Sequence, residues 1–130
     1  MKINSIKIGA LIASLSIMMG AFGAHLLKDK LSEKALTLYE TGVRYQLYHA
    51  FALIIVGILY QLNPNRPLKT AATLFLLGIL FFSGSLYVLS FKVNNNIEGL
   101  KWVGPITPLG GLCFILGWLF MAFNVNFKKK

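Results

Sequence analysis

Two histidines, His25 and His49, are the side chains of this sequence best suited to chemistry. His25 lies three residues before Lys28, at the end of one long apolar segment. His49 lies five residues after Arg44, at the start of the next. At about 1.5 Å of rise per residue, both imidazoles are expected roughly 5 to 8 Å below the same charged border, on adjacent antiparallel helices. Ionisable side chains at such depth are costly in lipid and commonly mark functional sites.

If the two imidazoles face each other, they form a polar pocket with three neighbouring side chains of the second helix. Such a pair could bind haem, a divalent metal or a quinone head group, or relay protons. Glycines on the first segment would leave room for a bulky ligand. The residues of this hypothetical binding site are His25, His49, Arg44, Tyr45 and Gln46.

The alternative interpretation of the histidines is structural, in which each imidazole makes one or two hydrogen bonds and holds the ends of the helices together. Two histidines fall short of the three or four protein ligands usual at zinc, so no metal site is predicted. The sequence contains no catalytic triad motif, phosphate-binding loop or paired carboxylate, and we therefore predict no enzyme and no cofactor. The single cysteine, Cys113, excludes an internal disulfide.

Long apolar runs must position these residues. Hydrophobic residues make up 56% of the 130 residues and charged residues only 13%, which is typical of a protein in lipid. Each run has close to the roughly 20 residues with which a helix crosses the hydrocarbon layer, and none alternates as a barrel strand would. We therefore predict a single all-α transmembrane domain, a four-helix bundle. The predicted spans are residues 8–27, 45–62, 70–91 and 109–127.

The connections between the runs carry further signals. Asp29 can cap a short helix with one apolar face, which predicts an amphipathic helix in the interface between the first two spans. Glu40 and Arg44, four residues apart, can pair on this helix, or one of them turns inward towards a histidine. The fourth span is predicted to begin with Thr107 as its N-cap and Pro108 at the first helical position.

Small residues and aromatic residues indicate how the spans pack. Helices in lipid approach closely at small residues, which stand four apart on the first and fourth spans. These pairs are Gly9 with Ala13, Gly20 with Ala24 and Cys113 with Gly117. Trp118 lies near mid-span and needs an acceptor for its indole N–H, which Ser83, Ser85 or a backbone carbonyl would supply. Tyr87 fits a belt of interfacial anchors.

The net charge of +9 is scattered over short connections, so no nucleic-acid partner is predicted. Four spans place both termini on one side, and every acidic residue falls on the other. We predict cytoplasmic termini, with the lysines at 128–130 anchoring the chain to anionic lipid. A secretory signal peptide is the alternative interpretation of the first run.

Four motifs in order resemble a known family. They are GAFGAH at 20–25, TGVRYQLYHA at 41–50, FSGSLY at 82–87, and ITPLGG at 106–111 with Gly117 and Trp118. Together they resemble the small membrane proteins called domain of unknown function 423, over nearly the whole chain. The resemblance implies a four-span bacterial inner-membrane protein without an assigned activity. It also implies that a set of polar residues belongs to the shared pattern: His25, Tyr45, Gln46, His49, Ser83, Ser85 and Thr107.

The sequence as a whole predicts a non-enzymatic accessory or scaffold component of the inner membrane. Its partners are then the lipid bilayer and either further copies of the chain or a larger membrane complex. The competing hypothesis is small-ligand binding, or proton or solute transport, through a polar pocket around His25 and His49.

Overall fold

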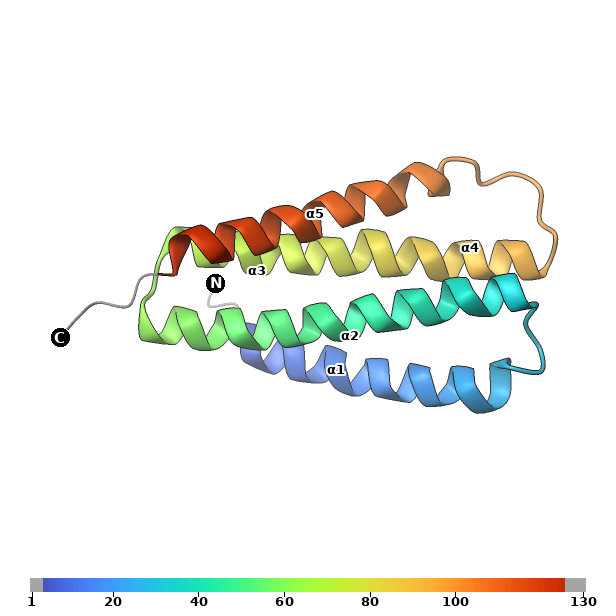
Figure 1. Cartoon of the computed structure of the whole chain (residues 1–130), viewed down its shortest axis with the longest axis horizontal. Coiled ribbons are helices and arrows are strands. Elements are labelled where there is room, and N and C mark those ends of the chain that lie inside the picture. The colour runs from blue at the N-terminus through green and yellow to red at the C-terminus, as the bar shows by residue number, and fades with distance from the viewer. Residues whose placement is uncertain (1–3, 126–130) are drawn as a thin grey trace.

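The computed structural model describes residues 4–125, and this part of the chain contains helices and no strand. Figure 1 shows the helices lying side by side along one long axis, with both termini towards the same end. Their bounds are Ser5–Phe22 for α1, Gly23–Leu27 for the π-helical turn η1, Glu33–Leu62 for α2, Arg66–Gly78 for α3, Ile79–Ser83 for the π-helical turn η2, Gly84–Asn94 for α4 and Val103–Asn124 for α5.

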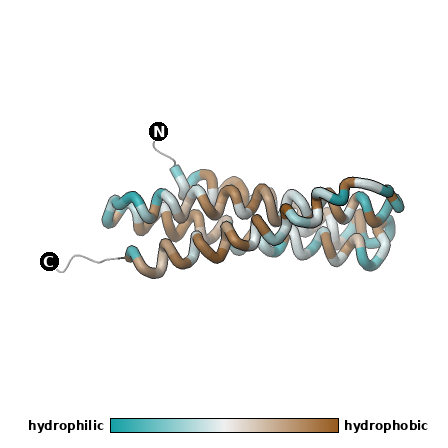
Figure 2. The backbone as a smooth tube through the Cα atoms, turned by 90° about the horizontal axis from the view of Figure 1, so that it is seen from above, coloured by the Kyte–Doolittle hydropathy of each residue, from teal (hydrophilic) through white to brown (hydrophobic). Residues whose placement is uncertain are grey.

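Four helical stretches are long and apolar enough to cross a membrane, because η1 extends α1 and η2 joins α3 to α4 without a break. These stretches are Ser5–Leu27, Glu33–Leu62, Arg66–Asn94 and Val103–Asn124. Figure 2 shows hydrophobic residues along the helices and hydrophilic residues gathered towards the two ends. The predicted all-α, four-span architecture is confirmed. The end of the predicted fourth span, 126–127, and the predicted lysine anchor, 128–130, lie outside the described residues.

Side-chain oxygens cap the starts of three helices. Asn4 caps α1, Ser32 caps α2 and Asn65 caps α3, each by accepting a hydrogen bond from a backbone N–H of the first turn. These N–H groups have no acceptor within the helix, so a polar side chain at this position stabilises the start. Ser32 thus takes the place of Asp29, the cap predicted from the sequence.

The amphipathic segment predicted as a separate interfacial helix is the first part of α2. This helix runs unbroken for 30 residues, about 45 Å, which exceeds the roughly 30 Å of hydrocarbon in a bilayer. Gly42 stays helical, and its small size admits the ring of Tyr87, which would lie 2.6 Å from an added Cβ. The Ser83 hydroxyl also donates to the Gly42 carbonyl at 2.7 Å. These contacts of Gly42 keep α2 straight at the residue where the sequence would allow a bend.

The fourth span begins earlier than the sequence predicts. Helix α5 starts at Val103, so Thr107 is not its N-cap, and Pro105 and Pro108 both lie inside it. The first turn tolerates a proline because its N–H groups have no helical acceptor, and a proline just beyond it removes only one bond. The Thr107 hydroxyl instead bonds to the Ser85 hydroxyl at 2.6 Å.

Small residues bring α1 against α2. A Cβ added to Gly9 would lie 2.7 Å from the carbonyl oxygen of Ala50, so this approach requires a glycine. Ala13 is buried one turn further along, whereas Ala24 is exposed. The predicted small-residue contact is confirmed at Gly9 and Ala13 and is wrong at Ala24.

The apolar core lies where α2, α3 and α5 meet. Its side chains are at most 4% exposed and include Leu53, Val56, Leu68, Phe75 and Phe114. The outer faces of α1 and α5 carry large exposed apolar side chains instead, which suits contact with lipid. The face of α2 that points away from α1 therefore packs in the core against α3 and α5.

Candidate functional site

A buried amide links three helices near the middle of the bundle. Gln46 of α2 is 5% exposed, and its Nε2 atom donates to the Ser16 hydroxyl of α1 at 2.9 Å. Its Oε1 atom accepts from the Tyr87 hydroxyl of α4 at 2.8 Å. Ser16 in turn donates to the carbonyl of Ile12 at 2.8 Å. The side-chain polar atoms of Gln46, Ser16 and Tyr87 therefore all have hydrogen-bond partners, as an apolar environment demands.

The same network extends along α2 through a second tyrosine. The Tyr39 hydroxyl donates to the backbone carbonyl of Met19 at 2.8 Å, and its ring lies 5.6 Å from that of Tyr87. Gly23, at the start of η1, lies under the Tyr39 ring, where an added Cβ would be 2.7 Å from a ring carbon. Tyr39 thus holds the end of the first span against α2.

Serine hydroxyls join η2 and α4 to α2. Ser83 donates to the carbonyl of Gly42 at 2.7 Å, and Ser90 donates to the carbonyl of Ala35 at 2.7 Å. These serines are at most 3% exposed. Such bonds add an interhelical link where apolar side chains gain nothing over lipid.

His49 is fully hydrogen-bonded within the bundle. Its Nδ1 atom lies 2.8 Å from the carbonyl oxygen of Tyr45, and its Nε2 atom lies 3.2 Å from the indole nitrogen of Trp118. The indole N–H is only a donor, so Nε2 accepts and Nδ1 carries the proton, which makes the ring the neutral tautomer. The ring also stacks on Phe114 with centroids 3.4 Å apart. The prediction that a serine or a backbone carbonyl serves Trp118 is therefore wrong, since His49 does so.

The structure does not bring His25 and His49 together. His25 is exposed on η1, whereas His49 is 4% exposed and faces α3 and α5. In the antiparallel pair of α1 and α2, Gly23 lies opposite Tyr39. Gly23 is two residues before His25, so His25 lies near the level of Tyr39. His49 is ten residues beyond Tyr39, about 15 Å further along the axis. The expectation of equal depth is wrong because α2 begins at Glu33, far ahead of the charged border used for counting.

Of the other predicted site residues, only Tyr45 lies beside His49. Arg44 is exposed, Gln46 faces α1 and α4, and the Tyr45 ring lies beside His49 and 4.7 Å from Phe82. Across residues 4–125, no group of three or more His, Cys, Asp or Glu side chains could hold a metal ion. The residues that come together are thus uncharged and form bonds between helices.

Most of this polar framework lies within a region shared with other proteins. A family model described as protein of unknown function (DUF423) matches residues 19–111. The chain belongs to the DUF423 family. The resemblance predicted from the four motifs is thereby confirmed, and within the matched region lie Gln46, His49, Ser83 and Tyr87.

Relatives of this DUF423 protein are named as membrane proteins. UPF0382 membrane protein SH2409 of Staphylococcus haemolyticus is 44% identical over 92% of each chain. UPF0382 membrane protein YwdK of Bacillus subtilis is 42% identical over 90% of this chain and 91% of its own. A UPF0382 membrane protein of Haemophilus influenzae is 39% identical over 100% and 98%, respectively. No solved structure matches the chain. Together with the four apolar helices, these names identify a membrane protein.

Ser16, Tyr39 and Ser90 are not among the site residues predicted from the sequence, and Tyr87 was expected only as an interfacial anchor. A usable signal was present, because Ser83, Tyr87 and Ser90 follow one another at spacings of four and three and so share one face of a helix. A polar face within an apolar run predicts contact with another helix.

Proposed function

We propose that this DUF423 protein is a non-enzymatic accessory or scaffold component of the bacterial inner membrane, working as a homo-oligomer or within a larger membrane complex. The observation that carries the proposal is that the buried polar groups of the protein form hydrogen bonds within the bundle. Gln46 joins three helices, and both ring nitrogens of His49 are hydrogen-bonded. Groups committed in this way hold the bundle in one arrangement and leave the outer helix faces for partners.

The outer face of α1 provides a surface on which such a partner can pack. Ala10, Ser14 and Ala21 are exposed, and at about 100° per residue they fall within about 40° of one another. His25 continues the same face within about 60°. Ser14 has no hydrogen-bond partner among the described residues. A neighbouring helix could approach closely over the two alanines and supply an acceptor for that hydroxyl.

The inner membrane and cytoplasmic termini belong to the same proposal. Helical spans suit the inner membrane, since outer-membrane spans are β-barrels. In the sequence, seven Lys and Arg residues fall on the side of the termini and six on the other side, which also carries all four acidic residues. The excess of one basic residue favours the side of the termini as the cytoplasmic side. Fluorescence of a C-terminal green fluorescent protein fusion would support this orientation. Activity of a C-terminal alkaline phosphatase fusion, without fluorescence of the first fusion, would contradict it.

Cysteine cross-linking in native membranes tests the packing surface. In a Cys113→Ala background, Ser14→Cys should form a covalent product under mild oxidation or with a short bis-maleimide. Leu15→Cys is the matched control, because Leu15 is 47% exposed at the same depth but points about 100° away. A product of doubled mass identifies a homo-oligomer, and one defined adduct identified by mass spectrometry identifies a larger complex. Equal reactivity at both positions, or a strictly monomeric protein after gentle extraction, would contradict the proposal.

A further inference from the structure

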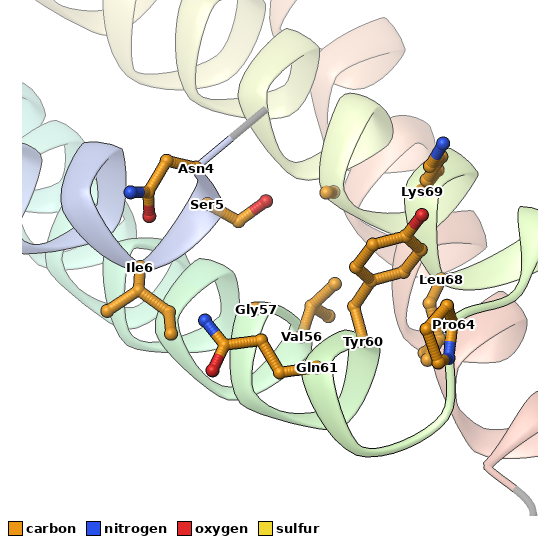
Figure 3. Close-up of a pocket in the computed structure, with 11 residues that line it drawn as sticks. Asn4, Ser5, Ile6, Val56, Gly57, Tyr60, Gln61, Pro64, Leu68 and Lys69 are labelled. Carbon is orange, nitrogen blue, oxygen red and sulfur yellow. The ribbon is translucent and has the colours of Figure 1, made fainter. Parts of the chain in front are cut away.

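A pocket of about 390 Å³ opens at the end of the bundle near the termini. Figure 3 shows it between the start of α1, the end of α2 and the start of α3. Its floor is apolar and includes Val56, Leu68 and Ala72, and its rim includes Ser5, Tyr60 and Lys69. The volume lies within the roughly 300 to 1,000 Å³ typical of ligand pockets.

Ser5 presents an accessible hydroxyl to this pocket. The residue is only 7% exposed, and its hydroxyl has no hydrogen-bond partner among the residues that the structure describes. Figure 3 shows the hydroxyl pointing from α1 into the space that faces α2 and α3. Since no side-chain polar atom of the described residues is both buried and unpartnered, this hydroxyl is accessible from the pocket and is free to bond to a ligand there.

The rim of the pocket is positively charged without a balancing carboxylate. The Lys69 ammonium lies 5.3 Å from the centroid of the Tyr60 ring, an arrangement that holds the cation at the rim by a cation–π contact. All the acidic residues of the chain fall between residues 29 and 40 or at Glu98, in connections and helix ends at the opposite end of the bundle. The starts of α1 and α3 add partial positive charge here and the end of α2 adds partial negative charge, so the three helix ends together leave a partial positive charge. The charge of the pocket therefore matches an anionic ligand.

The position of the pocket further limits the ligand. It lies where the apolar spans end, so that a cationic rim stands directly above an apolar floor. An occupant that satisfies both parts has an anionic group joined to an apolar chain. About 390 Å³ holds a head group and the first part of the chains, while the remaining chain length can follow the apolar outer surface.

We propose that this pocket binds an anionic glycerophospholipid from the adjoining membrane leaflet. Its phosphate pairs with Lys69, a polar head-group atom bonds to the Ser5 hydroxyl, and the glycerol backbone and first methylenes pack on the partly exposed side chains of Ile6 and Tyr60, which also line the pocket. The proposal does not depend on the packing surface of α1, because the two lie on different faces.

Native mass spectrometry of the full-length protein in a neutral detergent tests this site. Phosphatidylglycerol should bind about five- to tenfold more tightly than phosphatidylcholine of the same chains. Lys69→Gln should weaken phosphatidylglycerol binding about fivefold, the effect of about 1 kcal/mol for one lysine. Ser5→Ala should weaken it about threefold, as expected for one hydrogen bond. Unchanged thermal unfolding of each variant in detergent excludes misfolding as the cause.

Lys7→Gln is the matched control, because it removes the same charge at the same end from an exposed residue that does not line the pocket. Its effect should be less than twofold. An equal loss in Lys7→Gln and Lys69→Gln, or no preference between the two lipids, would overturn the proposal in favour of diffuse surface attraction. Displacement of the lipid by millimolar inorganic phosphate would overturn it in favour of a site for free anions.

Discussion

Replacing Gln46 with leucine should destabilise the bundle while nearly preserving side-chain volume. The change removes the only side chain that bonds to both α1 and α4 among the described residues. Ser16 keeps its hydrogen bond to Ile12, so its hydroxyl stays satisfied. Tyr87, by contrast, loses the acceptor of its hydroxyl inside the apolar bundle. The two halves of the network therefore respond differently to one substitution.

The expected loss of unfolding free energy in Gln46→Leu is about 2 to 3 kcal/mol. An interhelical hydrogen bond in a membrane protein contributes about 0.6 kcal/mol on average, which sets the cost of losing the bond to Ser16. A buried hydroxyl without an acceptor costs about 1 to 3 kcal/mol, which sets the larger cost at Tyr87. The penalty for the orphaned hydroxyl thus exceeds the value of the lost bond.

Reversible unfolding by sodium dodecyl sulfate in mixed micelles, followed by far-ultraviolet circular dichroism, measures this change. The double variant Gln46→Leu with Tyr87→Phe removes the orphaned hydroxyl, so it should be less destabilised than the two single variants predict together, by about 1 kcal/mol or more. Gln61→Leu is the matched control, because Gln61 is exposed and makes no side-chain hydrogen bond among the described residues; it should change stability by less than about 0.5 kcal/mol. Additive single variants, or a Gln46→Leu protein as stable as the wild type, would refute the reasoning.

Three further substitutions test the packing of the bundle in the same unfolding assay. His49→Phe should lower the unfolding free energy by about 1 to 3 kcal/mol, because the Trp118 indole N–H loses its acceptor. An unchanged stability would contradict the hydrogen bond. Gly9→Leu should destabilise by at least about 2 kcal/mol, since its Cβ alone would meet the carbonyl of Ala50, and a tolerated leucine would contradict the close approach. His25→Ala should stay within about 0.5 kcal/mol of the wild type because the ring is exposed, and a larger loss would reveal a contact beyond the described structure.

The number and order of the spans were predictable, but the ends of the helices were not. Apolar runs mark the parts of a helix in contact with lipid or core, whereas the helix itself continues until a cap or a breaker ends it. Helix α2 therefore extends back to Glu33, where Ser32 caps it, and α5 starts at Val103 despite two prolines in its first turns. The predicted start at residue 45 described only the apolar part of the helix.

The partners of the polar side chains were less predictable because they depend on how each helix is rotated and shifted against its neighbour. The sequence indicated that Gln46 and His49 needed partners, yet they lie three residues apart on α2 and point to different neighbours, Ser16 and Tyr87 on one side and Trp118 on the other. The register that decides this follows from close contacts such as Gly9 with Ala50. Counting residues from a charged border contains none of that information.

The same contacts explain why the pocket opens at the end near the termini. From Ser16 onward, α1 is joined to α2 by side-chain hydrogen bonds of Gln46 and Tyr39. Before Ser16, the described contacts between these helices are apolar, at Gly9 and Gly57, and no described hydrogen bond joins α1 to α3. Van der Waals contact with lipid is nearly equivalent to such packing, whereas a hydrogen bond to lipid methylenes is impossible. A lipid can therefore occupy the space between α1 and α3 without breaking a polar bond, whereas insertion between α1 and α2 from Ser16 onward would break the bonds of Gln46 and Tyr39.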